Sequence, residues 1–330
     1  MRSRVVSPVF KLIPPIQSVI IMQTEFIVIW GFRRSGAGLL ASSLGLFGAT
    51  LGSRASMPDE AGLEGAFEDA ELVRLNEEML NRLGFSWDTL CAIGEDHIAI
   101  LIEAGYLDRA VAYLRSRAGD GPIIGLKDPQ MTRLGLFWRK VFESIGTLPR
   151  SLVCFRDPRA VVQYLRRGAL RKIFPGFFLD TDYGQLLWLG YTLASLIYTE
   201  KYPRVLINYD KLLENPEGIL KQAATKLKLS YNDSGFDAFF DGYVSREKIA
   251  SRFHYDDPDG IIARAAQLYV TLCDEKNLEF PPFEKTGSMW PHTPSEQIMT
   301  KILAQAVREN RGLQDYIAEL TEQIQKLGHS

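Results

Sequence analysis

The feature that most constrains the fold is a strand, a glycine loop and a helix in direct succession. Residues 26–30 read Phe-Ile-Val-Ile-Trp, an unbroken apolar run that ends at Gly31. A short run of this kind predicts a strand that is buried on both faces, as in a parallel sheet. Residues 31–36 begin and end with glycine, and residues 36–47 have apolar positions at helical spacing. Because backbone N–H groups and the helix N-terminus point at an anion in such a unit, we expect a phosphate loop. The alternative is a plain strand-to-helix corner.

Strands and helices alternate along the rest of the chain up to about residue 230. Apolar runs predict further strands at 50–52, 122–126, 150–156 and 204–208. Helical spacing of apolar residues predicts helices at 69–83, 96–117, 134–145, from Pro158 onward, and at 185–200. This order predicts an α/β fold, with a P-loop-like parallel sheet covered by helices on both faces. We assign residues 25–290 to this domain.

The two ends of the chain differ from the domain between them. Residues 1–24 include an apolar stretch that Lys11 and the pair Pro14-Pro15 interrupt, so we interpret them as a disordered leader, with Met22 as an alternative start. Residues 295–328 carry apolar positions in a heptad pattern, which predicts a coiled-coil helix. We expect a homodimer through residues 299–327; the alternative is that this helix docks on its own domain.

Charge and cysteine content narrow the functional class. The chain has 38 Lys and Arg against 40 Asp and Glu, a net charge of −2, which argues against a dedicated nucleic-acid binder. Its three cysteines are far apart, which suits a reducing compartment, so we expect a cytoplasmic protein without a disulfide framework or a zinc site. The charge is locally uneven: residues 59–108 hold 13 acids and 2 bases, and residues 126–172 hold 11 bases and 3 acids. A local anion site fits the second segment.

The glycine loop is half of a Walker A pattern. Gly31 and Gly36 have its spacing, but Ala37 and Gly38 stand where the Lys and the Ser or Thr belong. Those two residues contact the β- and γ-phosphates and Mg²⁺ in P-loop enzymes. A P-loop kinase is therefore the less favoured interpretation.

Five segments together resemble the sulfotransferase family, in its bacterial glycan-type and tyrosylprotein forms. The loop 31–36 resembles the family's 5′-phosphosulfate loop, and the other four follow in the family's order. They are Gly65-Ala-Phe-Glu-Asp69, Leu126-Lys-Asp-Pro129, Phe155-Arg-Asp-Pro158, and Val205-Leu-Ile-Asn-Tyr-Asp210 with Leu213-Glu-Asn-Pro216. The similarity spans residues 25 to 230.

The resemblance implies an enzyme that uses 3′-phosphoadenosine 5′-phosphosulfate (PAPS) and moves its sulfuryl group to a hydroxyl of an acceptor, for which we favour a glycan or glycolipid. It implies catalytic roles for Arg34, for Lys127 and for Glu68 as the base, with Glu64 as the alternative base. It implies no metal. The donor-binding residues would be Arg33, Arg34, Ser35, Gly36, Ala37 and Gly38 in the loop, and Arg156, Tyr164 and Arg167 around the 3′-phosphate, where Arg159 and Arg166 are alternatives.

Three departures from the family pattern leave a second interpretation open. Ala37 and Gly38 replace two hydroxyl residues of the loop, and Tyr164 replaces a serine on the 3′-phosphate side. Each lost hydroxyl costs about 1 kcal/mol of binding. The alternative is a catalytically silent nucleotide-binding relative that dimerises through its tail.

Three further features have a structural interpretation beside the functional one. Glu68-Asp69 favours a helix N-terminus, and Asp128 suits an N-cap or an ion pair with Lys127. Residues 165–178 mix basic and aromatic side chains. They suit the donor, an acidic acceptor, a membrane surface or simply a solvated helix end.

Overall fold

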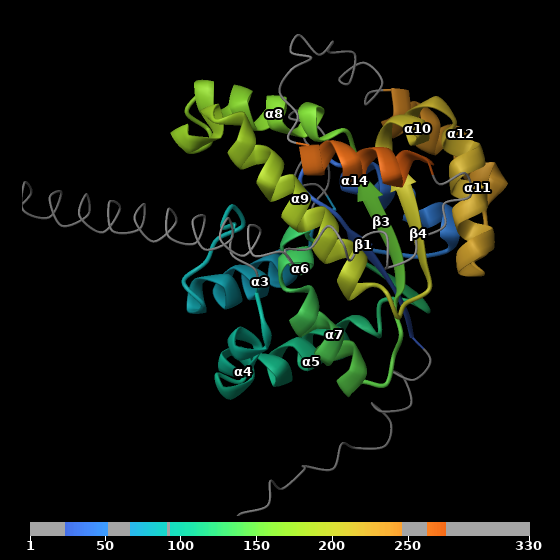
Figure 1. Ribbon diagram of the computed structural model, residues 1–330. Helices are drawn as coiled ribbons and strands as arrows, with labels where there is room; N and C mark the ends of the chain where they lie inside the picture. The colour runs from blue at the N-terminus through green and yellow to red at the C-terminus, as the bar shows by residue number, and fades with distance from the viewer. Residues whose placement is uncertain (1–23, 52–66, 91–92, 246–262, 275–330) are drawn as a thin grey trace, which may run out of the picture.

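The sheet has four parallel strands in the order β2-β1-β3-β4 (Figure 1). Their bounds are β1 (Glu25–Trp30), β2 (Ile123–Lys127), β3 (Arg150–Phe155) and β4 (Arg204–Asn208). Each neighbouring pair is parallel and in continuous register, with Val28 opposite both Leu126 and Ser151. The predicted α/β class with a parallel sheet is therefore confirmed.

The computed structural model describes residues 24–51, 67–90, 93–245 and 263–274. The predicted leader apart from Thr24, the alternative base Glu64 and the predicted coiled coil at 295–328 lie outside the described residues.

Of the predicted strand at 50–52, Gly52 lies outside the described residues, and Thr50 and Leu51 do not form a strand. Thr50 makes an isolated parallel bridge with Ile124 on the free edge of β2. The Thr50 N–H donates to Ile123 O at 3.0 Å, and Gly125 N–H donates to Thr50 O at 2.7 Å. These bonds use one residue of this segment only, so the edge of β2 is covered without a fifth strand in the described part of the chain.

Helices cover both faces of the sheet, as predicted. Phe26, Val28 and Trp30 point into one apolar core, and Ile27 and Ile29 point into the other. The first core packs against α3 (Ala70–Arg82), α4 (Glu95–Glu103), α5 (Tyr106–Arg117), α6 (Pro129–Arg133), α7 (Gly135–Ser144), α8 (Pro158–Leu170), α9 (Thr181–Tyr198) and α14 (Ala263–Asp274). The second packs against α2 (Ala37–Ser42), η1 (Leu44–Phe47), α10 (Tyr209–Glu214), α11 (Pro216–Leu227), α12 (Phe236–Phe239) and η4 (Phe240–Val244). Burial on both faces explains why β1 is apolar throughout.

Two predicted helices are interrupted. The one expected over 96–117 divides into α4 and α5 because Gly105 has φ of +80° and ends the first hydrogen-bonded run. The one expected over 36–47 divides into α2 and the 3₁₀ helix η1. Helix α8 begins at Pro158 as predicted, with Asp157 as its N-cap.

The strand order places the ends of β1 and β3 at a topological switch point. The chain passes from β1 to β2 on one side and then crosses to β3 on the other side of β1. The loops that follow β1 and β3 therefore diverge at the carboxyl edge, which is where open parallel sheets bind ligands. In Figure 1 the arrowheads of β3 and β4 point toward α14 and α10 at this edge.

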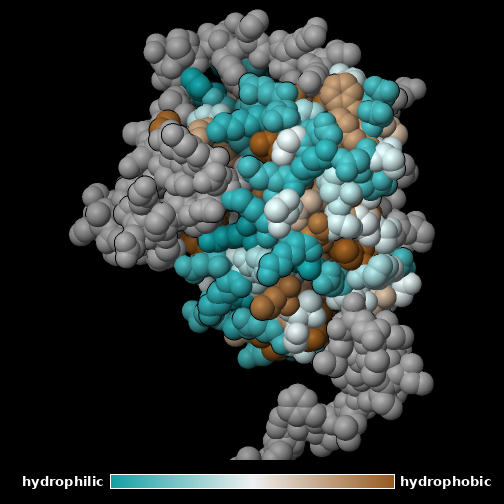
Figure 2. All heavy atoms as spheres, turned by 90° about the vertical axis from the view of Figure 1, so that its right-hand side faces the viewer, coloured by the Kyte–Doolittle hydropathy of each residue, from teal (hydrophilic) through white to brown (hydrophobic). Residues whose placement is uncertain are grey.

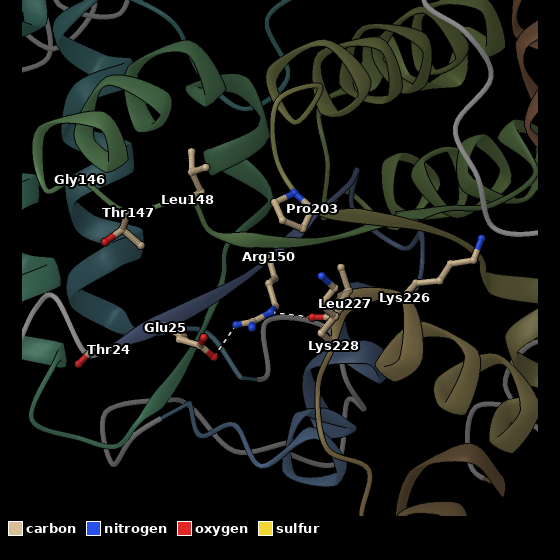
Figure 3. A pocket seen from close by; sticks show the side chains of 10 residues that line it. All are labelled: Thr24, Glu25, Gly146, Thr147, Leu148, Arg150, Pro203, Lys226, Leu227 and Lys228. Atoms are coloured by element: carbon tan, nitrogen blue, oxygen red, sulfur yellow. Dashed lines mark hydrogen bonds and ion pairs between the residues drawn. The ribbon is translucent and has the colours of Figure 1, made fainter.

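The opposite, amino edge carries a pocket of about 480 Å³ (Figure 3). Arg150 crosses it, pairs with Glu25 at 2.5 Å and donates to Leu227 O at 2.7 Å. These bonds join β1, β3 and α11, so Arg150 closes this end of the sheet. On the face formed by α10, α11 and α12, hydrophobic residues are scattered among hydrophilic ones (Figure 2). Among the described helices, none is long and apolar enough to cross a membrane.

Candidate functional site

The loop between β1 and α2 is held by close packing at both of its glycines. Gly31 has φ of +150°, and a Cβ there would lie 2.5 Å from the carbonyl oxygen of Cys154 on β3. Gly36 has φ of +102°, and its Cβ would lie 2.5 Å from the ring of Tyr209. Gly31 N–H also donates to Thr132 Oγ1 at 3.1 Å. The glycines are therefore required because the backbone of the loop approaches β3 and α10 too closely for any side chain.

Two arginines of this loop stack on aromatic rings. The guanidinium of Arg33 lies 4.8 Å from the ring centre of Trp87, and that of Arg34 lies 4.4 Å from the ring centre of Tyr164. Both arginines are half-buried. Stacking fixes the plane of a guanidinium while its edge keeps donors for an anion.

Arg156 follows β3 and stacks in the same way. Its guanidinium lies 4.5 Å from the ring centre of Tyr209, the ring on which Gly36 packs. Arg156 Nε lies 3.5 Å from Asp210 Oδ1, and burial raises the pKa of Asp210. Tyr209 thus links the loop after β1 to the cation after β3.

Two side-chain polar atoms of the loop, Arg33 Nε and the Ser35 hydroxyl oxygen, are buried without a hydrogen-bond partner in the described residues. The Ser35 hydroxyl is buried, and in the described part of the chain it has no hydrogen-bond partner. Buried hydroxyls are normally paired. Ala37 and Gly38 begin α2, and the N-cap, Gly36, has no side chain with which to cap that helix. An anion on this loop would meet backbone donors, the Ser35 hydroxyl and the two arginines.

The candidate base Glu68 and the candidate catalytic Lys127 form an ion pair. Lys127, the last residue of β2, donates from Nζ to Glu68 Oε1 at 2.5 Å. The side chain of Lys127 is 4% exposed and that of Glu68 is 19% exposed, so the carboxylate is the member that solvent or an acceptor reaches. Phe67, with φ of +62°, is buried against Tyr243 at 5.7 Å and turns the chain so that Glu68 faces β2.

Asp128 and Asp69, which flank these two residues, have structural roles. Asp128 caps α6 by accepting from Gln130 N–H at 2.9 Å, and it accepts from Asn76 Nδ2 at 2.7 Å. Burial, and after it the negative charge of Glu68, raises the pKa of Asp128 to about 7. Asp69 caps α3 and is paired with buried Arg117. The helix N-terminus expected at Glu68-Asp69 and the N-cap interpretation of Asp128 are confirmed.

Apart from Arg156, the residues predicted for the 3′-phosphate, with their alternatives, lie on α8. Tyr164 supports Arg34 and packs edge-on against Phe174 at 5.6 Å. Arg167 is half-buried three residues further along the helix, whereas Arg166 is exposed. Arg159 pairs with Asp157 at 2.6 Å. The structure therefore places Tyr164 against Arg34 of the loop, whereas Arg159 pairs with Asp157, the N-cap of its own helix.

Sequence reasoning missed the aromatic supports of the site. Trp87 carries Arg33, stacks on Phe178 at 5.4 Å, and accepts at its carbonyl from Tyr191 OH at 2.7 Å. No local pattern around Trp87 indicates this role, because its partners lie far away in the chain. Tyr209 lay inside a recognised segment, but only its contact with Gly36 explains it. Among the described residues, no group of three His, Cys, Asp or Glu side chains is placed to hold a metal ion.

Solved structures similar to this chain include two sulfotransferase domains. This is the family that the sequence motifs resemble. The domain from the Synechococcus PCC 7002 olefin synthase is 17% identical, with a TM-score of 0.42 over 78% of this chain and 96% of that one. The domain from the curacin biosynthetic pathway is 15% identical, with a TM-score of 0.39 over 64% of this chain and 76% of that one. No protein-family model and no curated protein match the chain.

Proposed function

We propose that this protein is a PAPS-dependent sulfotransferase that acts on a hydroxyl of a glycan or glycolipid. The observation that carries the proposal is the position of three groups at the carboxyl ends of adjacent strands. They are the Arg33-Arg34 loop after β1, the Lys127–Glu68 pair at β2 and Arg156 after β3. Two phosphate-bearing ends of one donor need separate cationic sites, and the loop and Arg156 supply them.

The residues at the carboxyl edge fit such a donor. Gly31 and Gly36 let the loop pack closely on Cys154 and Tyr209, beside Arg156, and the Ser35 hydroxyl lacks a partner in the described chain. A 5′-phosphosulfate on this loop would supply that partner. Tyr209 holds Arg156 beside the same loop, which suits a 3′-phosphate on the donor's ribose.

The chain's own residues can divide the reaction between them. The donor supplies a sulfuryl group, which leaves its phosphate oxygen and forms a bond to the acceptor oxygen. Glu68 takes the proton of the acceptor hydroxyl, and Arg34 and Lys127 offset the charge that grows on the leaving oxygen. Catalysis of this kind depends on positioning and charge stabilisation. The cytoplasm remains our proposed location, in keeping with three cysteines that lie far apart in the sequence.

One observation favours a second function, nucleotide binding without turnover. Tyr164 occupies the position of a serine in the family pattern, and Arg34 is stacked on it. Ala37 and Gly38 also lack hydroxyls, so the loop offers the donor fewer hydrogen bonds. A donor held in this way can bind without being aligned for transfer of its sulfuryl group. A kinase function is the least supported, because the loop has no lysine for the β- and γ-phosphates.

Binding and turnover measurements separate these functions. Calorimetry with 3′,5′-ADP should show binding, and ³⁵S-labelled PAPS should label a hydroxylated glycan or glycolipid acceptor. Arg156→Ala should weaken 3′,5′-ADP binding by roughly 10- to 100-fold, since it removes charge-assisted bonds. Arg82→Ala, an exposed arginine in the last turn of α3, is the matched control and should bind normally.

Glu68→Gln should keep 3′,5′-ADP binding and lose turnover, with folding verified by thermal unfolding because Lys127 loses its charged partner. Binding without turnover on any acceptor would support the nucleotide-binding function. Absent 3′,5′-ADP binding, or an Arg34→Ala protein with an unchanged transfer rate, would refute the sulfotransferase function.

A further inference from the structure

The turn between α8 and α9 is built as a rigid projection. We call residues 166–179 the α8–η2 turn; it holds the end of α8 and the 3₁₀ helix η2 (Gly176–Leu179). The ring of Phe174 lies so close to Gly168 that an added Cβ would approach it to 2.1 Å. Lys172 has φ of +59°, and Ile173 N–H donates to Gly168 O at 2.9 Å. These contacts lock the turn, so the side chains on its outer side are held outward.

This turn exposes three large apolar side chains. Leu170 and Ile173 are each 67% exposed, and Leu179 is 47% exposed. Of the seven large hydrophobic side chains that are exposed in the described chain, three lie within this turn. Single exposed leucines are ordinary, but a cluster on a projecting turn indicates a contact surface. Figure 1 shows the turn at the outer ends of α8 and α9, away from the sheet.

The same turn is strongly basic. Arg166, Arg171 and Lys172 are exposed, and Arg167 is half-buried. The sequence has no acidic residue between Asp157 and Asp180. Positive charges around protruding aliphatic side chains are complementary to an anionic lipid surface, because headgroups pair with the cations while the aliphatic groups enter the acyl boundary.

We propose that the α8–η2 turn binds the surface of an anionic lipid bilayer. An acidic soluble macromolecule would use the charges alone and would leave Leu170, Ile173 and Leu179 in water. A bilayer uses both features, and for this reason the observations favour it. A single surface of this size anchors a protein reversibly.

The inner side of the turn connects this surface to the candidate site. Phe174 packs on Tyr164 at 5.6 Å and on Trp87 at 5.9 Å. Tyr164 and Trp87 are the rings on which Arg34 and Arg33 are stacked. Bilayer contact would therefore bring the loop close to the headgroups. If the proposed function holds, a lipid-linked acceptor would reach the site from this side; the bilayer contact itself does not depend on it.

Vesicle sedimentation with the full chain tests the proposal. Vesicles of 70% phosphatidylcholine and 30% phosphatidylglycerol should bind the protein at 50 mM salt, and vesicles of phosphatidylcholine alone should not. Arg171→Glu should weaken partitioning about 25-fold, since each basic side chain contributes about five-fold and reversal adds an equal repulsion. Ile173→Ser should weaken it about ten-fold, through the loss of apolar burial.

Matched variants on the opposite edge control for these changes. Leu148→Ser replaces a side chain that is 64% exposed beside the pocket of Figure 3, and Lys201→Glu reverses an exposed charge after α9. Both should bind vesicles as the wild type does. Equal losses in the turn variants and these controls would overturn the proposal, as would absent binding to anionic vesicles. Loss of binding in Arg171→Glu but not in Ile173→Ser, together with binding to soluble polyglutamate, would instead assign the turn to an acidic macromolecule.

Discussion

Replacing Gly36 by alanine tests how closely the loop packs on α10. Gly36 has φ of +102°, and an added Cβ would lie 2.5 Å from Cδ2 of Tyr209. A side chain in this backbone region costs about 1–2 kcal/mol. Crowding a packed neighbour costs about 1–3 kcal/mol more, and the buried ring of Tyr209 has little room to move. We therefore expect Gly36→Ala to lower the free energy of unfolding by about 3 kcal/mol.

Substitutions at two other glycines separate the cost of backbone strain from the cost of crowding Tyr209. Gly105 has φ of +80° but nothing within 4 Å of an added Cβ, so Gly105→Ala should cost only the backbone strain, about 1 kcal/mol. Gly45 has neither a positive φ nor a neighbour within 4 Å. Gly45→Ala should change stability by less than about 0.5 kcal/mol, or increase it by restricting the unfolded chain.

Urea denaturation followed by tryptophan fluorescence measures all three variants, because Trp30, Trp138 and Trp188 are fully buried and report on global unfolding. The expected order of destabilisation is Gly36→Ala, then Gly105→Ala, then Gly45→Ala. If Gly36→Ala is no less stable than Gly105→Ala, the close approach of the loop to Tyr209 is refuted.

Two further predictions concern buried charges. Arg117→Leu should lower the free energy of unfolding, measured by thermal denaturation, by about 3–5 kcal/mol because it leaves the buried Asp69 carboxylate without its cation. Arg74→Leu, in an exposed pair with Glu78, should lower it by under about 1 kcal/mol, and similar losses in both variants would contradict this reasoning. Because the pKa of Asp128 is raised to about 7, the folded protein keeps a proton that the unfolded chain releases above about pH 4. The unfolding free energy of the wild type should therefore fall relative to that of Asp128→Asn between about pH 4 and pH 7, by up to about 4 kcal/mol, and a constant difference across this range would count against the assignment.

The parallel sheet was predictable because the residues of each strand form a short apolar run in the sequence. Residues 26–30 are apolar at every position, and only a strand covered on both faces requires that. In the described residues, the strand expected at 50–52 is reduced to a bridge at Thr50, because a short segment next to glycine does not show whether a partner edge is available. Within the described part of this segment, only Thr50 exchanges backbone hydrogen bonds with the edge of β2.

The break in the helix predicted over 96–117 has a similar explanation. Apolar spacing continues through Gly105, so periodicity alone favours one helix. Whether a glycine stays helical or adopts positive φ depends on where the next turn must pack. Here α4 and α5 both pack on the core near α7, and the chain turns between them.

For the site, the sequence by itself determined which residues have the right chemistry and on which strand end each stands. Arg34, Lys127 and Arg156 were placed by the apolar run that precedes each of them. Only the tertiary structure decided that Glu68 pairs with Lys127 across 59 positions and that Arg33 rests on Trp87. The physical reason is range: strand and turn preferences act between neighbours in the chain, whereas these contacts depend on the strand order β2-β1-β3, which brings an acidic and a basic segment to the same edge of the sheet.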